Sequence, residues 1–178
     1  SSDGTKMYMV GIGTDAVHQY TLSTAWDLST AFYDSVSFGV SSEDANPREI
    51  TFSSDGTKMY MVGTATDTVY QYTLSTAWDL STASFANKSF YVGGQESGPI
   101  GLDFSSDGTK MYMVGIGTDA VHQYTLSTAW DLSTAFYDSV SFGVSSEDAN
   151  PREITFSSDG TKMYMVGLGT DTVYQYSV

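Results

Sequence analysis

Short runs with apolar residues on both faces recur along the whole chain, separated by turn residues. In residues 58–62, Met59 and Met61 lie on one face of an extended strand, and Tyr60 and Val62 lie on the other. A half-exposed sheet would instead alternate apolar with polar residues. The pattern therefore predicts small sheets, each packed between two neighbours, and no segment has a convincing helical period.

Turn signals divide this pattern into units of four expected strands. In one complete unit the strands are predicted at 49–52, 58–62, 68–74 and 85–92. We call them the inner, second, third and outer strands, in chain order. An SSDG turn separates the first two strands, where Gly tolerates a positive φ and Asp can bond its own backbone. A longer segment at 75–83, STAWDLSTA, is named here the tryptophan loop.

The units repeat with a fixed period of 52 residues. The string SSDGTKMYMVG occurs four times, and residues 1–63 are identical to residues 105–167. Fixed periods of this size indicate a repeat architecture. Four antiparallel strands per unit favour a β-propeller over a β-solenoid, whose repeats are usually shorter.

The repeat also resembles known propeller sequences. The segment ITFSSDGTKMYMVG, followed by TDTVYQYTL, is similar to the "SPDGtklYV…TVsvydl" pattern of the YVTN, NHL and TolB-like repeats. The resemblance covers every unit and implies the fold alone: an all-β propeller of four-stranded antiparallel blades. It transfers no functional residue, because the matched motif is structural.

The predicted strands do not divide into whole blades. Residues 1–46 would form a blade without its inner strand, residues 47–98 and 99–150 two complete blades, and residues 151–178 a blade without its outer strand. The chain thus holds about three and a half blades, whereas closed propellers typically have four to eight. We expect the missing neighbours to come from a second copy in a homodimer, or from a longer array. The identical copies indicate recent amplification or design.

Composition narrows the range of partners. Seven basic and 21 acidic residues give a net charge of −14, which repels phosphate backbones and anionic lipid, so we expect neither nucleic acid nor membrane as a partner. There is no cysteine, no apolar run of membrane-spanning length and no visible signal peptide. The compartment stays open, and an extracellular or surface location is compatible with the sequence.

Odd and even units differ mainly at one predicted end of the propeller, in the loops that join the outer strand of one unit to the inner strand of the next. These joining loops carry the only arginines, with flanking carboxylates that could bind a sugar or another small polar ligand. The alternative is an Arg–Glu pair that ties neighbouring blades together. The candidate ligand-binding residues are Glu43, Asp44, Asn46, Arg48, Glu49, Glu147, Asp148, Asn150, Arg152 and Glu153.

Other chemically suggestive residues have structural interpretations. The tryptophans could stack on sugar rings or pack between blades, with packing favoured. The aspartates of the SSDG turns are expected to be turn formers rather than calcium ligands, and the methionines are expected to fill the core. The two histidines take a strand position that tyrosine fills in the other units, which favours packing over catalysis. We expect no metal and no cofactor.

No catalytic motif occurs in the sequence. The leading hypothesis is therefore a non-enzymatic scaffold or interaction module that assembles by completing blades between chains. A lectin-like binder that uses the joining loops is the second hypothesis, and a propeller hydrolase or lyase is the third.

Overall fold

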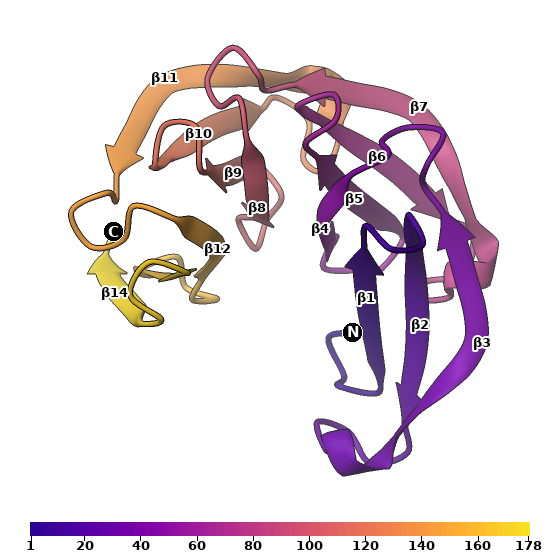
Figure 1. The fold of residues 1–178 in the computed structure, drawn as a ribbon. Helices are drawn as coiled ribbons and strands as arrows, with labels where there is room; N and C mark the ends of the chain where they lie inside the picture. The colour runs from indigo at the N-terminus through magenta and orange to yellow at the C-terminus, as the bar shows by residue number, and fades with distance from the viewer.

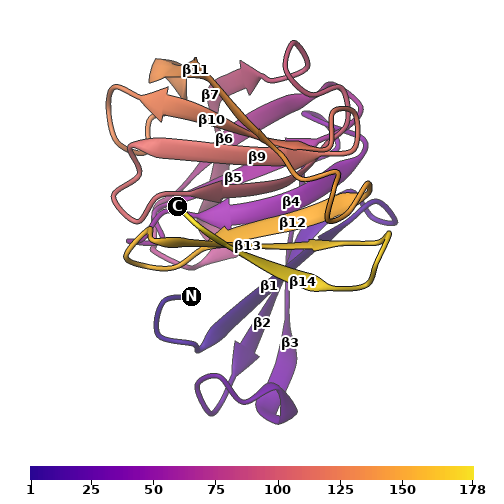
Figure 2. The same cartoon turned by 90° about the vertical axis from the view of Figure 1, so that its left-hand side faces the viewer.

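The computed structural model describes all residues from 1 to 178 and contains fourteen strands in four antiparallel sheets. Figure 1 shows the sheets following one another around an arc, with β4, β8 and β12 on its inner side and the two termini at its two ends. Figure 2 shows the last sheet across the front and the first sheet below it. Short 3₁₀ turns are the only helical segments, and none could cross a membrane.

The sheets confirm the predicted fold: propeller blades of four antiparallel strands, about three and a half per chain. The second and third sheets have four strands each, whereas the first lacks an inner strand and the last lacks an outer one. The strands are β1 (Lys6–Gly11), β2 (Ala16–Leu22), β3 (Ala31–Gly39), β4 (Pro47–Phe52), β5 (Lys58–Gly63), β6 (Thr68–Leu74), β7 (Ala83–Tyr91), β8 (Pro99–Phe104), β9 (Lys110–Gly115), β10 (Ala120–Leu126), β11 (Ala135–Gly143), β12 (Pro151–Phe156), β13 (Lys162–Gly167) and β14 (Val173–Ser177).

The outer strand begins earlier than the sequence predicts. β7 starts at Ala83 rather than Phe85 because it contains a bulge: Tyr72 of β6 pairs with Phe85, while the adjacent Gln71 pairs with Lys88. Asn87, within the bulge, has a φ of 54°, a value that asparagine tolerates better than most residues. The bulge leaves residues 86 and 87 of β7 without partners on β6. Pairing resumes before the bulge and reaches Ala83, the last residue of the tryptophan loop.

The core lies between the sheets. Three clusters of buried apolar side chains occupy the three intersheet spaces. Second-strand methionines of the last three sheets belong to them: Met59, Met61, Met111, Met113, Met163 and Met165 are each at most 4% exposed. The predicted packing of both strand faces thus holds for every sheet that has a neighbour on both sides.

Candidate functional site

Two glutamates meet where the inner strands of three sheets lie side by side. Glu49 is on β4 and Glu153 on β12, on either side of β8 in the arc (Figure 1). β8 has Gly101 at the equivalent repeat position, and a Cβ there would lie 2.9 Å from the carbonyl oxygen of Arg152 and 3.1 Å from the Cα of Glu153. Glycine therefore allows β12 to approach β8 closely. The two glutamate side chains hydrogen-bond to each other.

The surroundings of Glu153 favour its protonated form. Burial, the hydrogen bond to Glu49 and the negative charges of Glu49 and Asp103 together raise the pKa of Glu153 to about 10, and burial is the largest of these causes. Glu153 is therefore protonated at neutral pH and can donate to the Glu49 carboxylate. A proton donor and a proton acceptor are thus held side by side on rigid strands.

A third carboxylate on these inner strands was not among the predicted site residues. Asp103 of β8 accepts hydrogen bonds from the backbone N–H of Phe104 at 2.8 Å and from that of Phe156 at 2.9 Å, so it links β8 to β12. Burial raises its pKa. The sequence did contain a signal, because the equivalent position in the other units is threonine, at Thr51 and Thr155.

The two arginines begin the same inner strands but form no ion pair. The Arg48 Nε–H donates to the Thr64 hydroxyl at 3.0 Å, and the Nε of Arg152 is buried without a hydrogen-bond partner. All three salt bridges of the chain involve lysine and aspartate. The expected alternative, an Arg–Glu pair tying blades together, is therefore wrong. The glutamates pair with each other instead.

Carboxylates of the joining loops tie neighbouring blades together by another route. Asp44 is 2% exposed and accepts from the backbone N–H of Thr66 at 3.0 Å, from its hydroxyl at 2.6 Å and from the Asn46 N–H at 2.7 Å. The Asp148 carboxylate does the same for Thr170 and Asn150. Glu96, which was not predicted, takes this place in the even unit.

These loop carboxylates thus hold the turn between the second and third strands of the following sheet. Their oxygens are already occupied by protein donors. Glu43 is similarly engaged, because it accepts from the Ser42 hydroxyl at 2.8 Å and from the Tyr72 hydroxyl at 3.2 Å. The Glu147 carboxylate accepts from the Ser146 hydroxyl at 2.7 Å. The ten predicted residues therefore separate into an inner-strand group and a group of loop braces.

Two of the three tryptophans pack against phenylalanine rings. The Trp78 ring lies 5.4 Å from that of Phe52, and the Trp130 ring lies 5.5 Å from that of Phe104. Each phenylalanine belongs to the tryptophan's own sheet, but the Trp130 ring also lies 6.3 Å from that of Tyr60 in the preceding sheet. The expected packing between blades is therefore confirmed for Trp130. Trp26, on the first sheet, is 74% exposed.

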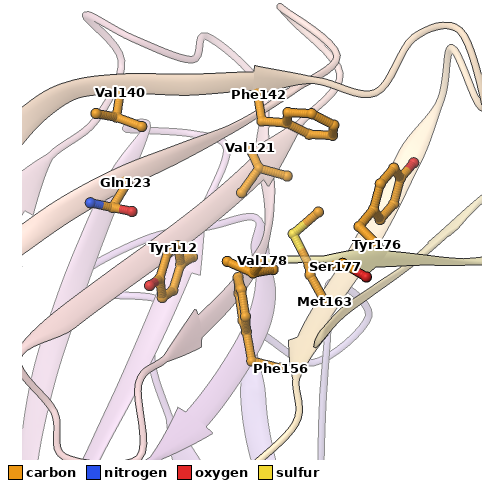
Figure 3. A pocket seen from close by; sticks show the side chains of 10 residues that line it. All are labelled: Tyr112, Val121, Gln123, Val140, Phe142, Phe156, Met163, Tyr176, Ser177 and Val178. Atoms are coloured by element: carbon orange, nitrogen blue, oxygen red, sulfur yellow. The ribbon is translucent and has the colours of Figure 1, made fainter. Parts of the chain in front are cut away.

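An apolar cavity of about 190 Å³ lies between the third and last sheets. Figure 3 shows Tyr112 and Phe156 on its lower side, Val121 and Phe142 above them, and Gln123 at one end. In the other two intersheet spaces the equivalent place holds a tryptophan loop. We therefore attribute the cavity to intersheet packing rather than to recognition of a polar ligand.

Comparisons with known proteins identify the fold. No protein-family model and no curated protein matches the sequence. Among solved structures, the chain matches a provisionally named 6-phosphogluconolactonase from Bacteroides fragilis (TM-score 0.63, 19% identity, 98% of this chain and 48% of that one). It also matches a periplasmic gluconolactonase from Pseudomonas aeruginosa (TM-score 0.63, 18% identity, 98% and 47%). A nidogen/laminin complex matches with a TM-score of 0.59 at 13% identity (98% and 57%).

These likenesses establish a β-propeller, and the chain spans about half the length of the two lactonases. They also correct the functional expectation. The sequence suggested a non-enzymatic scaffold and placed a hydrolase last, yet several of the matching structures are named as lactonases. The prediction that the chain is not an enzyme, and the ranking behind it, are therefore wrong. A motif search cannot relate Glu49 to Glu153, because the two glutamates lie on separate strands and 104 residues apart in the sequence.

Proposed function

We propose that the chain contributes the inner-strand carboxylates of a hydrolase that opens sugar lactones. The observation that carries this proposal is the hydrogen-bonded contact of the Glu49 and Glu153 side chains, which the close approach of β12 to β8 at Gly101 permits. A general base and a general acid next to each other are what hydrolysis of a cyclic ester requires. The lactonase names among the matching structures favour this substrate class over other esters.

The proposed reaction adds water to the lactone carbonyl. The Glu49 carboxylate removes a proton from the attacking water, and the new C–O bond gives a tetrahedral intermediate. The ring C–O bond then breaks, and the departing ring oxygen takes the proton of Glu153. The product is the open hydroxy acid. Transfer of the proton from Glu49 to Glu153 along their hydrogen bond restores the starting state.

Arginine supplies the recognition chemistry in this proposal. The buried Nε–H of Arg152 has no partner in the protein, and a guanidinium pairs well with a phosphate or carboxylate. Because the surrounding protein is strongly acidic, an anionic substrate would depend on this local positive charge. We therefore expect a lactone bearing a phosphate to be a better substrate than the neutral sugar lactone.

The test is a titration assay at constant pH with glucono-δ-lactone and its 6-phosphate, corrected for spontaneous opening. The parent chain should release acid faster than buffer alone. Glu49→Gln and Glu153→Gln should each reduce kcat by roughly 10²–10⁴-fold, the usual contribution of general acid–base catalysis. The matched control is Asp171→Asn, which removes one exposed carboxylate in the turn between β13 and β14 and does not touch the glutamate pair.

Asparagine tolerates the φ of 50° at position 171, so the control should keep the parent rate. Thermal melting should show that all three variants remain folded. A parent chain that is folded and releases acid no faster than buffer would refute the proposal. So would a Glu153→Gln variant that keeps full activity.

A further inference from the structure

The first two interfaces between neighbouring sheets are built from the same contacts. We call the side of a sheet that meets the preceding sheet its front face, and the side that meets the following sheet its back face. Between the first and second sheets, Tyr8 stacks on Phe52 at 4.4 Å, and its hydroxyl donates to the Trp78 carbonyl at 2.6 Å. The Leu80 N–H donates to the side-chain carbonyl of Gln19 at 2.8 Å. The back face therefore offers Tyr and Gln, and the front face offers the tryptophan loop.

The next interface repeats these contacts with nearly the same distances. Tyr60 stacks on Phe104 at 4.4 Å, and its hydroxyl donates to the Trp130 carbonyl at 2.7 Å. The Leu132 N–H donates to Gln71 at 2.8 Å. Two independent copies thus define which groups belong to each half of the interface.

The first sheet presents an unoccupied front face. Trp26 and Leu28 of its tryptophan loop are 74% and 69% exposed, and Met9 of its second strand is 52% exposed. Their repeat equivalents in the second sheet are covered: Leu80 is 1% and Met61 0% exposed. An exposed apolar cluster of this kind is typical of an interaction surface.

The last sheet presents an unoccupied back face. Val173 is 68% exposed, whereas Val17 and Val69, its equivalents in the first two sheets, are fully buried. Gln175 is also exposed, with no partner for its side chain, whereas the equivalent Gln71 is 2% exposed. The two ends of the arc therefore carry the two complementary halves of the interface.

We propose that a second copy of this chain docks head to tail on these two faces, front face on back face, and closes a ring of two copies. The occupant is indicated by the molecule itself, because the front faces that fit the back faces of the first two sheets are repeats of the exposed one. The arc also matches about half the length of the two lactonases. Two arcs of four sheets give eight, within the range of closed propellers.

A front-to-back contact joins two different surfaces and is therefore heterologous. Two copies form a closed ring only if the front face of each one contacts the back face of the other. The inner carboxylates of the two copies would then face a common channel. This docking proposal is independent of the proposed lactonase activity, because it is argued from the repeated contacts between sheets and is tested by measuring molecular mass. Each contact lacks one inner and one outer strand, so we expect it to be weaker than an internal one and to depend on concentration.

The test is sedimentation velocity of the full chain over a wide concentration series. One copy has a mass of 19.2 kDa, so the expected product at high concentration is twice 19.2, or 38.4 kDa. A chain that remains a monomer at every concentration would overturn the proposal. Species that keep growing beyond two copies would overturn the closed ring.

Two variants test the faces separately. Leu28→Asp places a carboxylate on the front face, and Val173→Asp places one on the back face. Both residues are exposed in the single chain, so its melting temperature should change little. Each variant alone should associate at least about tenfold more weakly, because docking would bury an unpaired charge. The control is Phe136→Asp, which changes an apolar residue of the outer strand β11 that is 51% exposed and should leave association unchanged.

Mixing the two variants determines the orientation of docking. A front-to-back pair of the two variants has one contact without any substitution, so the mixture should recover dimer that neither variant forms alone. If two copies instead docked front to front, Val173→Asp alone would still dimerise. That result, or a mixture no better than its components, would refute head-to-tail docking.

Discussion

The same nine residues, STAWDLSTA, occur in this molecule in two surroundings. In the second and third sheets the loop is covered, and Leu80 and Leu132 are 1% and 0% exposed. In the first sheet the loop faces outward, and Leu28 is 69% exposed. The backbone is nonetheless alike, because the tryptophan φ is 65°, 63° and 61° in the three copies.

The difference separates local from tertiary stabilisation. Each copy is held locally by an aspartate cap, such as Asp27 accepting from the Ser29 N–H at 3.0 Å, and by a bond from the tryptophan N–H to a glycine carbonyl in the SSDG turn. These bonds are enough to shape the loop without a neighbour. The neighbouring sheet adds burial, which contributes about 1.5–3 kcal/mol per leucine side chain.

The largest expected effect comes from truncating the covered leucine. Leu80→Ala should lower the free energy of unfolding by about 2–5 kcal/mol, because it removes buried methyl groups and leaves a cavity. Leu28→Ala makes the same change in the same sequence and should cost less than about 0.5 kcal/mol. Urea denaturation, at a concentration where the chain is a monomer, measures both. Equal losses would show that the loop stabilises its own sheet rather than the intersheet contact.

A smaller effect is expected from the glutamine that receives the loop. Gln71→Ala would leave the buried Leu132 N–H without its acceptor, a cost of about 1–3 kcal/mol. The comparison is Gln175→Ala, at an exposed copy of the same position, where we expect a change within about 0.5 kcal/mol. Amide hydrogen exchange measures the effect at this one bond, since the Leu132 amide should lose protection in Gln71→Ala and keep it in Gln175→Ala. Unchanged protection would mean that another group accepts this bond.

Much of the fold follows from the sequence because the repeat and the strand patterns are local properties. The period of 52 and the apolar residues on both strand faces predicted four-stranded blades, and the third strand 68–74 was predicted with its observed bounds. The outer strand was harder to predict. Its bulge depends on pairing with β6 and on the positive φ of Asn87, which no hydrophobic pattern encodes.

The site was only partly predictable, because it depends on which strands become neighbours. Glu49 and Glu153 were among the candidates as parts of loops, but their contact requires β12 to lie close against β8 at Gly101. Asp44 also carries a carboxylate, yet its oxygens accept hydrogen bonds from the backbone amides of Asn46 and Thr66. Sequence alone does not distinguish a carboxylate that braces a turn from one that hydrogen-bonds to a carboxylate of another sheet.

Carboxylates in two surroundings give the last prediction. The pKa of Glu153 is raised to about 10, whereas hydrogen bonds from Ser53 and Thr57 lower the pKa of Asp55 in its SSDG turn to about 2. Because folding favours the protonated form of Glu153, its contribution to stability is complete below its ordinary pKa of 4.5 and is lost as the pH rises towards 10. Asp55 contributes in the opposite sense, above its ordinary 3.8, and loses that contribution as the pH falls towards 2.

Glu153→Gln should therefore leave the melting temperature unchanged near pH 4 and raise it at pH 8–9, by about 2–4 °C per kcal/mol for a chain of this size. Glutamine is neutral at every pH and still offers a hydrogen-bond donor to Glu49, so folding at pH 8–9 no longer requires the uptake of a proton at position 153. Asp55→Asn should instead lower the melting temperature at neutral pH and approach the parent near pH 2. Melting curves across the pH range measure both. A Glu153→Gln variant that is less stable at pH 9 than the parent would show that Glu153 is ionised in the folded chain and paired with a cation, and it would remove the proton donor from the proposed reaction.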